Sequence, residues 1–120
     1  MSKETTYDFW NELVGKQLSS VEFVQYYLQL RFDGPCINVT NPLTVKDKLN
    51  EITSWKEGFR DLLCEQITKI VSNVQYEKTR ALTIHFEDET LLKISLLHEH
   101  YSSSEAIYAH GFENDGWLVE

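Results

Sequence analysis

The sequence predicts an α+β fold, in which a mostly antiparallel sheet is built from two similar α-β-β-β units with helices packed against it. Short stretches of alternating apolar and polar residues follow one another across turns too short for crossover helices, which favours antiparallel pairing. The pattern from Val14 to Val39 also recurs from Ile67 to Ile94, each time after a helical pattern. We expect one domain spanning 1–120, with halves at approximately 6–40 and 58–97 and a C-terminal hairpin at 106–119.

The internal pseudo-repeat rests on matched apolar positions. A shift of 53 residues aligns the start of the two copies, and one extra residue in each of the next two turns keeps the match to the end. Any two meanders of half-buried strands share a period of two, so a chance resemblance between the halves is the alternative. The aligned pairs are Val14 with Ile67, Leu18 with Val71, Val21 with Val74, Phe23 with Tyr76, Leu28 with Leu82, Leu30 with Ile84, Ile37 with Leu92 and Val39 with Ile94.

The first half is expected to contain one helix and three strands. A side-chain oxygen of Thr5 or Thr6 caps the helix in this interpretation, and Gly15 ends it. Strands are expected at 16–24, 27–32 and 36–40, with a hairpin turn at Asp33-Gly34-Pro35.

The second half is expected to repeat this order after an irregular segment at 41–57. Within that segment Val45, Leu49 and Ile52 indicate a short helix. Ser54 and Glu57 have the spacing of a capping box, which predicts a helix over about 55–67. Strands are expected at 69–77, 80–87 and 90–97, followed by a pair at 106–111 and 116–119 that turns at Asn114-Asp115-Gly116.

Charge and hydropathy narrow the class of partner. The 19 acidic and 11 basic residues give a net charge of -8, which disfavours nucleic acid and anionic membranes and suits a basic protein partner as well as plain solubility. No apolar run reaches the roughly 18 residues of a membrane span, and the first residues do not resemble a secretion signal. We therefore expect a cytoplasmic protein, either alone or as a homodimer.

Two stretches carry a resemblance to a known family. The residues SVEFVQYYLQLRFDGP from Ser20 to Pro35, and GFRDLLC from Gly58 to Cys64, resemble a family of small uncharacterised bacterial proteins. That family has no established function, so the resemblance implies a small bacterial cytosolic domain and assigns no site residues.

A histidine cluster offers one candidate site. On a strand, His98 and His100 would project to the same side, and His110 could complete a metal site with them. The alternative is that these are surface histidines in a polar loop. The two cysteines, Cys36 and Cys64, lack metal or redox spacing and are expected to be buried thiols.

The outward residues of the repeated strands offer the second candidate site. Tyr27, Gln29, Arg31 and His85 are the predicted binding residues, and the repeat would place Arg31 and His85 on one surface. No local pattern supplies an activated nucleophile, and no cofactor is predicted. The sequence therefore favours a non-catalytic protein-binding domain, with an inhibitor-like or immunity-like role as one form of it. The alternative is a metal-binding or small-molecule-binding domain, or an enzyme, that uses the three histidines.

Overall fold

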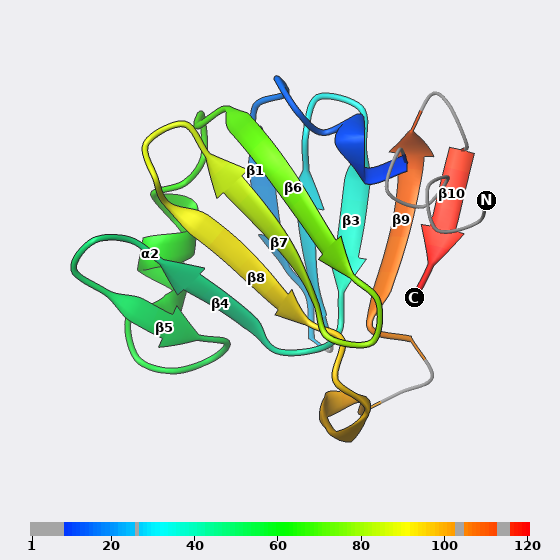
Figure 1. Ribbon diagram of the computed structural model, residues 1–120. Helices are drawn as coiled ribbons and strands as arrows, with labels where there is room; N and C mark the ends of the chain where they lie inside the picture. The colour runs from blue at the N-terminus through cyan, green and yellow to red at the C-terminus, as the bar shows by residue number, and fades with distance from the viewer. Residues whose placement is uncertain (1–8, 26, 103–104, 113–115) are drawn as a thin grey trace.

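Two five-stranded sheets form the body of the protein (Figure 1). The computed structural model describes residues 9–25, 27–102, 105–112 and 116–120. The first sheet has the order β1-β2-β3-β9-β10, with strands Ser20–Phe23, Leu28–Arg31, Cys36–Val39, Ile107–Phe112 and Gly116–Val119. The second has the order β5-β4-β8-β7-β6, with strands Glu51–Thr53, Leu43–Lys46, Leu91–Ser95, Ala81–Phe86 and Val71–Glu77. All of these pairings are antiparallel, as predicted, but the strands form two sheets instead of one and the fold is mostly β.

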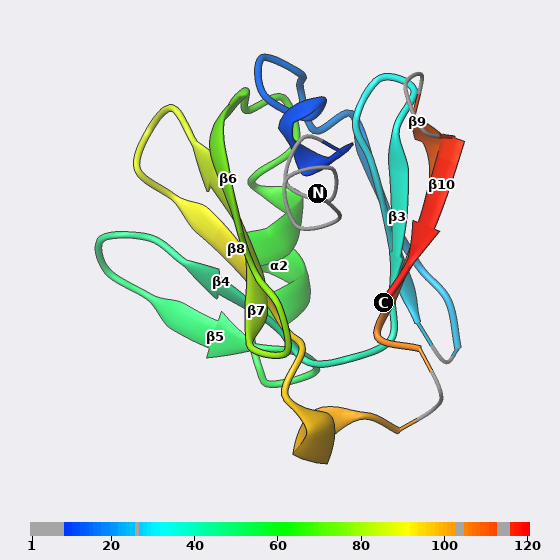
Figure 2. The ribbon, with the colours of Figure 1, turned by 45° about the vertical axis from the view of Figure 1, so that its right-hand side comes forward.

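Alternation along the strands explains why the sheets pack face to face. On β2, Leu28 and Leu30 are buried while Arg31 is exposed, and on β4, Leu43 and Val45 are buried. These side chains belong to one hydrophobic cluster with those of the other strands, so the core lies between the sheets (Figure 2).

Two short helical segments lie between the sheets. Helix α2, Phe59–Cys64, contacts β1 of the first sheet and β4 and β5 of the second (Figure 2). Near the opposite edge of the second sheet, residues 9–11 are helical, and Trp10 packs against Tyr76 of β6 and Phe112 of β9. Both segments therefore add apolar side chains to the core.

The prediction of a helix within 41–57 is wrong. This segment contains β4 and β5, joined by a turn in which the Asp47 carboxylate accepts the N–H groups of Leu49 and Asn50 at 2.8 and 2.7 Å. Leu49 is 91% exposed at this turn. The spacing of its apolar residues therefore indicated a helical face that the hairpin does not form.

The helix expected over 55–67 is shorter, and its capping box does not form. α2 begins after Gly58, which has a φ of 85°, and no side chain caps it. The Ser54 hydroxyl instead accepts the N–H of Leu43 at 2.7 Å, because Ser54 continues the β4–β5 pairing. Trp55, also with a positive φ, separates the strand from the helix.

Of the helix ends and turns expected near the ends of the chain, the one at Gly15 is confirmed. Gly15 has a φ of 88° and follows the first helical segment, as predicted. The expected caps at Thr5 or Thr6 and the turn at Asn114 and Asp115 lie outside the described residues. Among the helices that are described, none is both long and apolar enough to cross a membrane.

Candidate functional site

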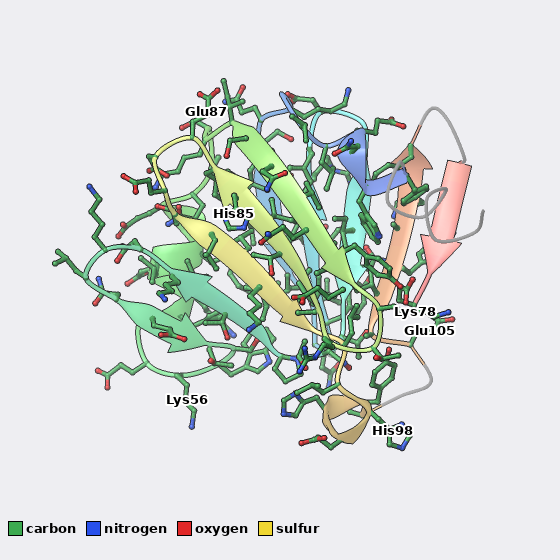
Figure 3. All side chains as sticks on the ribbon, in the orientation of Figure 1. Lys56, Lys78, His85, Glu87, His98 and Glu105 are labelled. Atoms are coloured by element: carbon green, nitrogen blue, oxygen red, sulfur yellow. The ribbon has the colours of Figure 1, made fainter. Side chains whose placement is uncertain are left out.

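The predicted binding residues are divided between the two sheets. Gln29 and Arg31 face outward from β2 in the first sheet, and Tyr27 lies in the turn before that strand. His85 lies on β7 in the second sheet (Figure 3). Because the core lies between the sheets, their outward residues face opposite sides of the molecule. The expectation that Arg31 and His85 share one surface is therefore wrong.

Several of these side chains are already engaged with neighbours on their own sheet. With its amide oriented to satisfy both atoms, Gln29 donates to Glu22 Oε1 at 3.2 Å and accepts from Arg31 Nη2 at 3.2 Å. On the other sheet, His85 Nε2 and Gln75 Oε1 lie 2.8 Å apart in a hydrogen bond. A ligand that binds Gln29, Arg31 or His85 would have to replace these existing hydrogen bonds.

The three candidate metal ligands do not assemble. His98 and His100 lie in a single 3₁₀ turn, not in a strand, so residues two apart point in different directions. His100 Nδ1 is hydrogen-bonded to Ser95 Oγ at 2.5 Å, and His110 stacks on Tyr108 in β9. Within 9–25, 27–102 and 105–112, no group of three His, Cys, Asp or Glu side chains is arranged to hold a metal ion.

An exposed tryptophan between β5 and α2 marks a surface that the sequence did not predict. Trp55 is 53% exposed, and its φ of 69° places a bulky residue in the left-handed region. This conformation directs the chain from the end of β5 into the turn that precedes α2. The ring packs edge-on against Phe59, at the start of α2, and against Phe23, at the end of β1.

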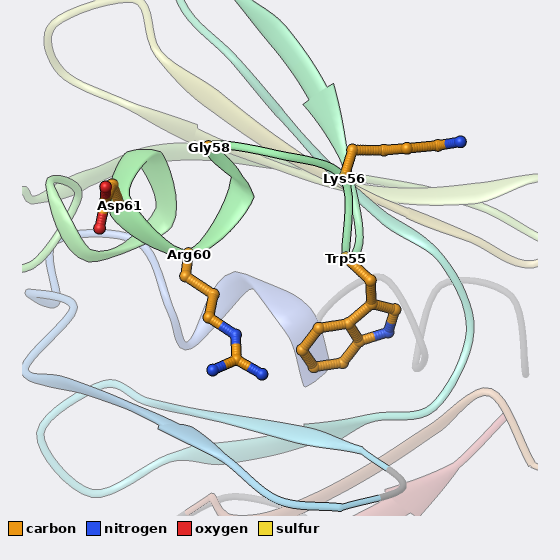
Figure 4. A pocket seen from close by; sticks show the side chains of 5 residues that line it. All are labelled: Trp55, Lys56, Gly58, Arg60 and Asp61. Atoms are coloured by element: carbon orange, nitrogen blue, oxygen red, sulfur yellow. The ribbon is translucent and has the colours of Figure 1, made fainter.

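Arg60 completes this cluster. Its guanidinium carbon lies 5.2 Å from the centre of the Phe23 ring and 5.6 Å from that of Trp55, within the range of cation–π attraction. Figure 4 shows Trp55 and Arg60 directed to the same side of α2. We call Phe23, Trp55 and Arg60 the Trp55 patch.

Two shallow hollows flank the patch. One, of about 440 Å³, is lined by Phe23, Val24, Gln25, Trp55 and Arg60. The other, of about 360 Å³, is lined by Trp55, Lys56, Gly58, Arg60 and Asp61 (Figure 4). Trp55 and Arg60 line both hollows, so the two hollows adjoin each other at these side chains.

The charge of Arg60 is not balanced by a carboxylate of the described chain. The ion pairs between described side chains join Lys48 to Glu89 and Lys69 to Asp88, and neither includes Arg60. Figure 4 shows the Asp61 carboxylate on a different side of α2 from the Arg60 guanidinium. The patch thus combines aromatic surface with a cation that is free to receive an anion.

A larger groove lies on the outer face of the second sheet. Its volume is about 680 Å³, and Thr44, Thr53, Lys93, Ser95 and His100 are among the residues that line it. The Thr44 and Thr53 hydroxyls are bonded to each other at 2.9 Å, and the Ser95 hydroxyl accepts the Leu97 N–H at 3.2 Å besides its bond to His100. These hydroxyl and imidazole groups are bonded within the protein and hold the loop and the strands, while charged side chains also line the groove: Glu51, Glu77, Arg80 and Lys93.

Sequence reasoning missed the Trp55 patch because Ser54 and Glu57 indicated a helix over Trp55. A signal was present, since Trp55 is the one apolar residue in the polar segment Thr53-Ser54-Trp55-Lys56-Glu57. The prediction that both cysteines are buried is half wrong. Cys36 is buried, but Cys64, the last residue of α2, is exposed.

Comparisons with known proteins do not identify a relative. No family model, curated protein or solved structure matches this chain. Any function must therefore be argued from the site itself.

Proposed function

We propose that this protein is a non-catalytic protein-binding domain and that the Trp55 patch is its contact surface. The observation that carries the proposal is an exposed tryptophan in a backbone conformation that favours glycine, held beside an arginine without an ion-pair partner in the described chain. Tryptophan and arginine are enriched among the residues that dominate binding energy. The arrangement suits recognition better than catalysis, because it contains no nucleophile or base.

The backbone strain at Trp55 supports a role beyond stability. A non-glycine residue in the left-handed region costs roughly 1–2 kcal/mol, and strain of this kind concentrates at functional sites. A half-exposed ring that makes two edge-on aromatic contacts recovers only part of the apolar burial available to a core tryptophan such as Trp10, which is 1% exposed. Covering Trp55 with a partner would bury the remaining surface.

The partner expected from the charge of the chain is a basic protein. The net charge of -8 would attract such a partner over distances of about a Debye length and speed association. An inhibitor-like or immunity-like role, in which this acidic chain covers a basic partner, is the more specific form of the proposal. A cytoplasmic location remains the expectation.

Site-specific photo-crosslinking tests the proposal. A photoreactive amino acid at Lys56, which lines the hollow beside Trp55, should capture a defined partner in extracts of the source cell. The matched control is Lys78, an exposed residue well separated from Lys56 in Figure 3. Capture from position 56 that disappears on Trp55→Ala supports the proposal. Equal capture from both positions, or capture unaffected by Trp55→Ala, refutes it, as does recovery of only uncrosslinked chain.

We also propose that the two halves are copies of one unit of five strands. In this scheme β1 to β5 correspond to β6 to β10, and each unit donates its last two strands to the sheet of the other. When each strand of the first sheet is replaced by its counterpart, the order β1-β2-β3-β9-β10 becomes β6-β7-β8-β4-β5. This is the order of the second sheet, read from its other edge.

The strand registers support this correspondence. The pair Leu30 and Ile37 on β2 and β3 matches the pair Ile84 and Leu92 on β7 and β8, as the aligned apolar positions require. At the centre, Gln17 bridges Ile70, its own counterpart under the 53-residue shift. A local twofold axis through this bridge would relate the two halves.

The proposed repeat allows the exposed Trp55 patch to be compared with the equivalent region at the other end of the molecule. Tyr76 is the counterpart of Phe23, and at that end of the molecule Tyr76 donates a hydrogen bond to the Glu120 carboxylate at 2.7 Å while Trp10 is buried. Burial and this bond raise the pKa of Tyr76 above its ordinary value. The chain thus closes one end with its own tryptophan and carboxylate, whereas at the other end the tryptophan and a cation stay exposed.

A further inference from the structure

We propose that the partner presents a carboxylate next to an apolar side chain, that Arg60 receives the carboxylate, and that the apolar side chain enters the hollow beside Phe23. This inference rests on the proposed function and deepens it by naming what the partner must carry. The occupant is a segment of a protein, and the carboxylate is an aspartate or glutamate side chain or a chain terminus.

The position of Arg60 leaves its hydrogen-bonding groups available. Its guanidinium carbon is 5.2 and 5.6 Å from the Phe23 and Trp55 ring centres, so both rings help to position the cation. The ion pairs between described side chains do not include it. The N–H groups of an arginine form a fork that can bind both oxygens of a carboxylate.

Burial of Trp55 would also remove water from Arg60. The two side chains line both hollows together, so a partner that covers the ring must also cover much of the guanidinium. A desolvated cation without an anion is strongly unfavourable. None of the described acidic residues is paired with Arg60, so the compensating charge must come from the partner.

The neighbouring charges do not replace this requirement. In Figure 4 the Lys56 ammonium extends away from the guanidinium, and the Asp61 carboxylate lies on a different side of the helix. Lys56 adds positive potential to the hollow in Figure 4 and Asp61 adds negative potential, so the two offset each other and Arg60 remains the group that receives the anion. A basic partner is compatible with this contact, because net charge governs long-range attraction while a single carboxylate governs the local contact.

The apolar part of the occupant follows from the hollow beside Phe23. Phe23 and Val24 are half-buried there, and with Trp55 they line a space of about 440 Å³. This falls within the range of roughly 300–1,000 Å³ that holds small ligands, so an aromatic or branched apolar side chain fits. The carboxylate at Arg60 and the apolar group in this hollow would then lie side by side.

A pair of small probes tests this recognition without knowledge of the partner. Phenylacetate carries a ring and a carboxylate, and phenylacetamide has nearly the same shape without the charge. Binding is followed by NMR through the indole N–H signal of Trp55, which is assigned by its loss in Trp55→Phe. We expect phenylacetate to shift this signal saturably and to bind about fivefold or more tightly than phenylacetamide, corresponding to about 1 kcal/mol.

Two variants give the test its controls. Arg60→Gln should abolish the preference for the acid, and Arg60→Lys should keep part of it, because lysine retains the charge but lacks the forked N–H groups that bind both carboxylate oxygens. Equal binding of the two probes, a shift from neither, or an unchanged preference in Arg60→Gln would overturn the inference. Circular dichroism of each variant verifies that the fold is retained.

This result is separable from the fate of the proposed function. If photo-crosslinking captures a partner through Trp55 but the Arg60→Gln protein captures it equally well, the patch binds protein and only the carboxylate inference fails. If no Trp55-dependent partner is captured, the proposed function fails, whatever the probes show.

Discussion

The strain at Trp55 predicts an unusual order of stability between two variants. Trp55→Ala and Trp55→Gly both remove the indole and its contacts with Phe23, Phe59 and Arg60, so those losses cancel when the two variants are compared. Alanine keeps the cost of a φ of 69°, about 1–2 kcal/mol, whereas glycine adopts this conformation freely. Glycine loses roughly 0.5–1 kcal/mol more in backbone entropy than alanine on folding. Trp55→Gly should therefore be more stable than Trp55→Ala by about 0.7 kcal/mol, the difference between the mid-values of the two ranges.

Urea unfolding followed by far-ultraviolet circular dichroism measures this difference without relying on the tryptophan signal. The control is the same pair of substitutions at Lys56, an exposed neighbour that is not among the residues with positive φ. There the order should reverse, because alanine is favoured wherever φ is negative. If alanine is favoured over glycine at position 55 by as much as at position 56, the left-handed conformation does not exist in solution and the argument from strain is wrong.

Two further predictions concern stability away from the patch. Gly111→Ala should destabilise the fold by about 3 kcal/mol in a urea titration, because its Cβ would overlap the Gly34 carbonyl oxygen. Gly15→Ala has a similar positive φ but open space around it, and should cost only about 1 kcal/mol; equal losses would contradict the close approach. Partial burial opposes ionisation of Asp88, yet the hydrogen bonds from Lys69 and the Thr90 N–H lower its pKa below the ordinary 3.8. The ionised Asp88 carboxylate therefore stabilises the folded state above about pH 3.8. Asp88→Asn should be less stable than wild type at pH 7, by up to about 1 kcal/mol. The difference should disappear as the pH falls below the lowered pKa of Asp88. A difference that persists in acid would exclude this charge effect.

The strands were predictable where alternation and turn chemistry agree. Leu28 and Leu30 alternate with polar residues and are buried, and the Asp33-Gly34 turn that follows them has positive φ at both positions, as two-residue hairpin loops favour. The β4–β5 hairpin was missed because the spacing of its apolar residues is also that of a helix. Asp47 and Asn50 carried the turn signal there.

The division into two sheets could not be read from local pattern. It depends on the pairing of β3 with β9 and of β4 with β8, and these strands are far apart in the sequence. Alternation shows which face of a strand is buried but not which distant strand lies beside it. The Trp55 patch was hidden for a related reason, because Phe23 and Arg60 meet only once β1 and α2 are packed together.

The measurement that tests the central claim most directly is the affinity of the captured partner for three purified proteins, by isothermal titration calorimetry: the wild type, Trp55→Ala, and Lys78→Ala as the control. If Trp55 is the anchor of the interface, Trp55→Ala should weaken binding about 30-fold, which corresponds to about 2 kcal/mol. Lys78→Ala should leave the affinity unchanged, because Lys78 lies in a separate turn between β6 and β7. A dissociation constant that is the same for wild type and Trp55→Ala would show that the partner binds elsewhere and would contradict the account.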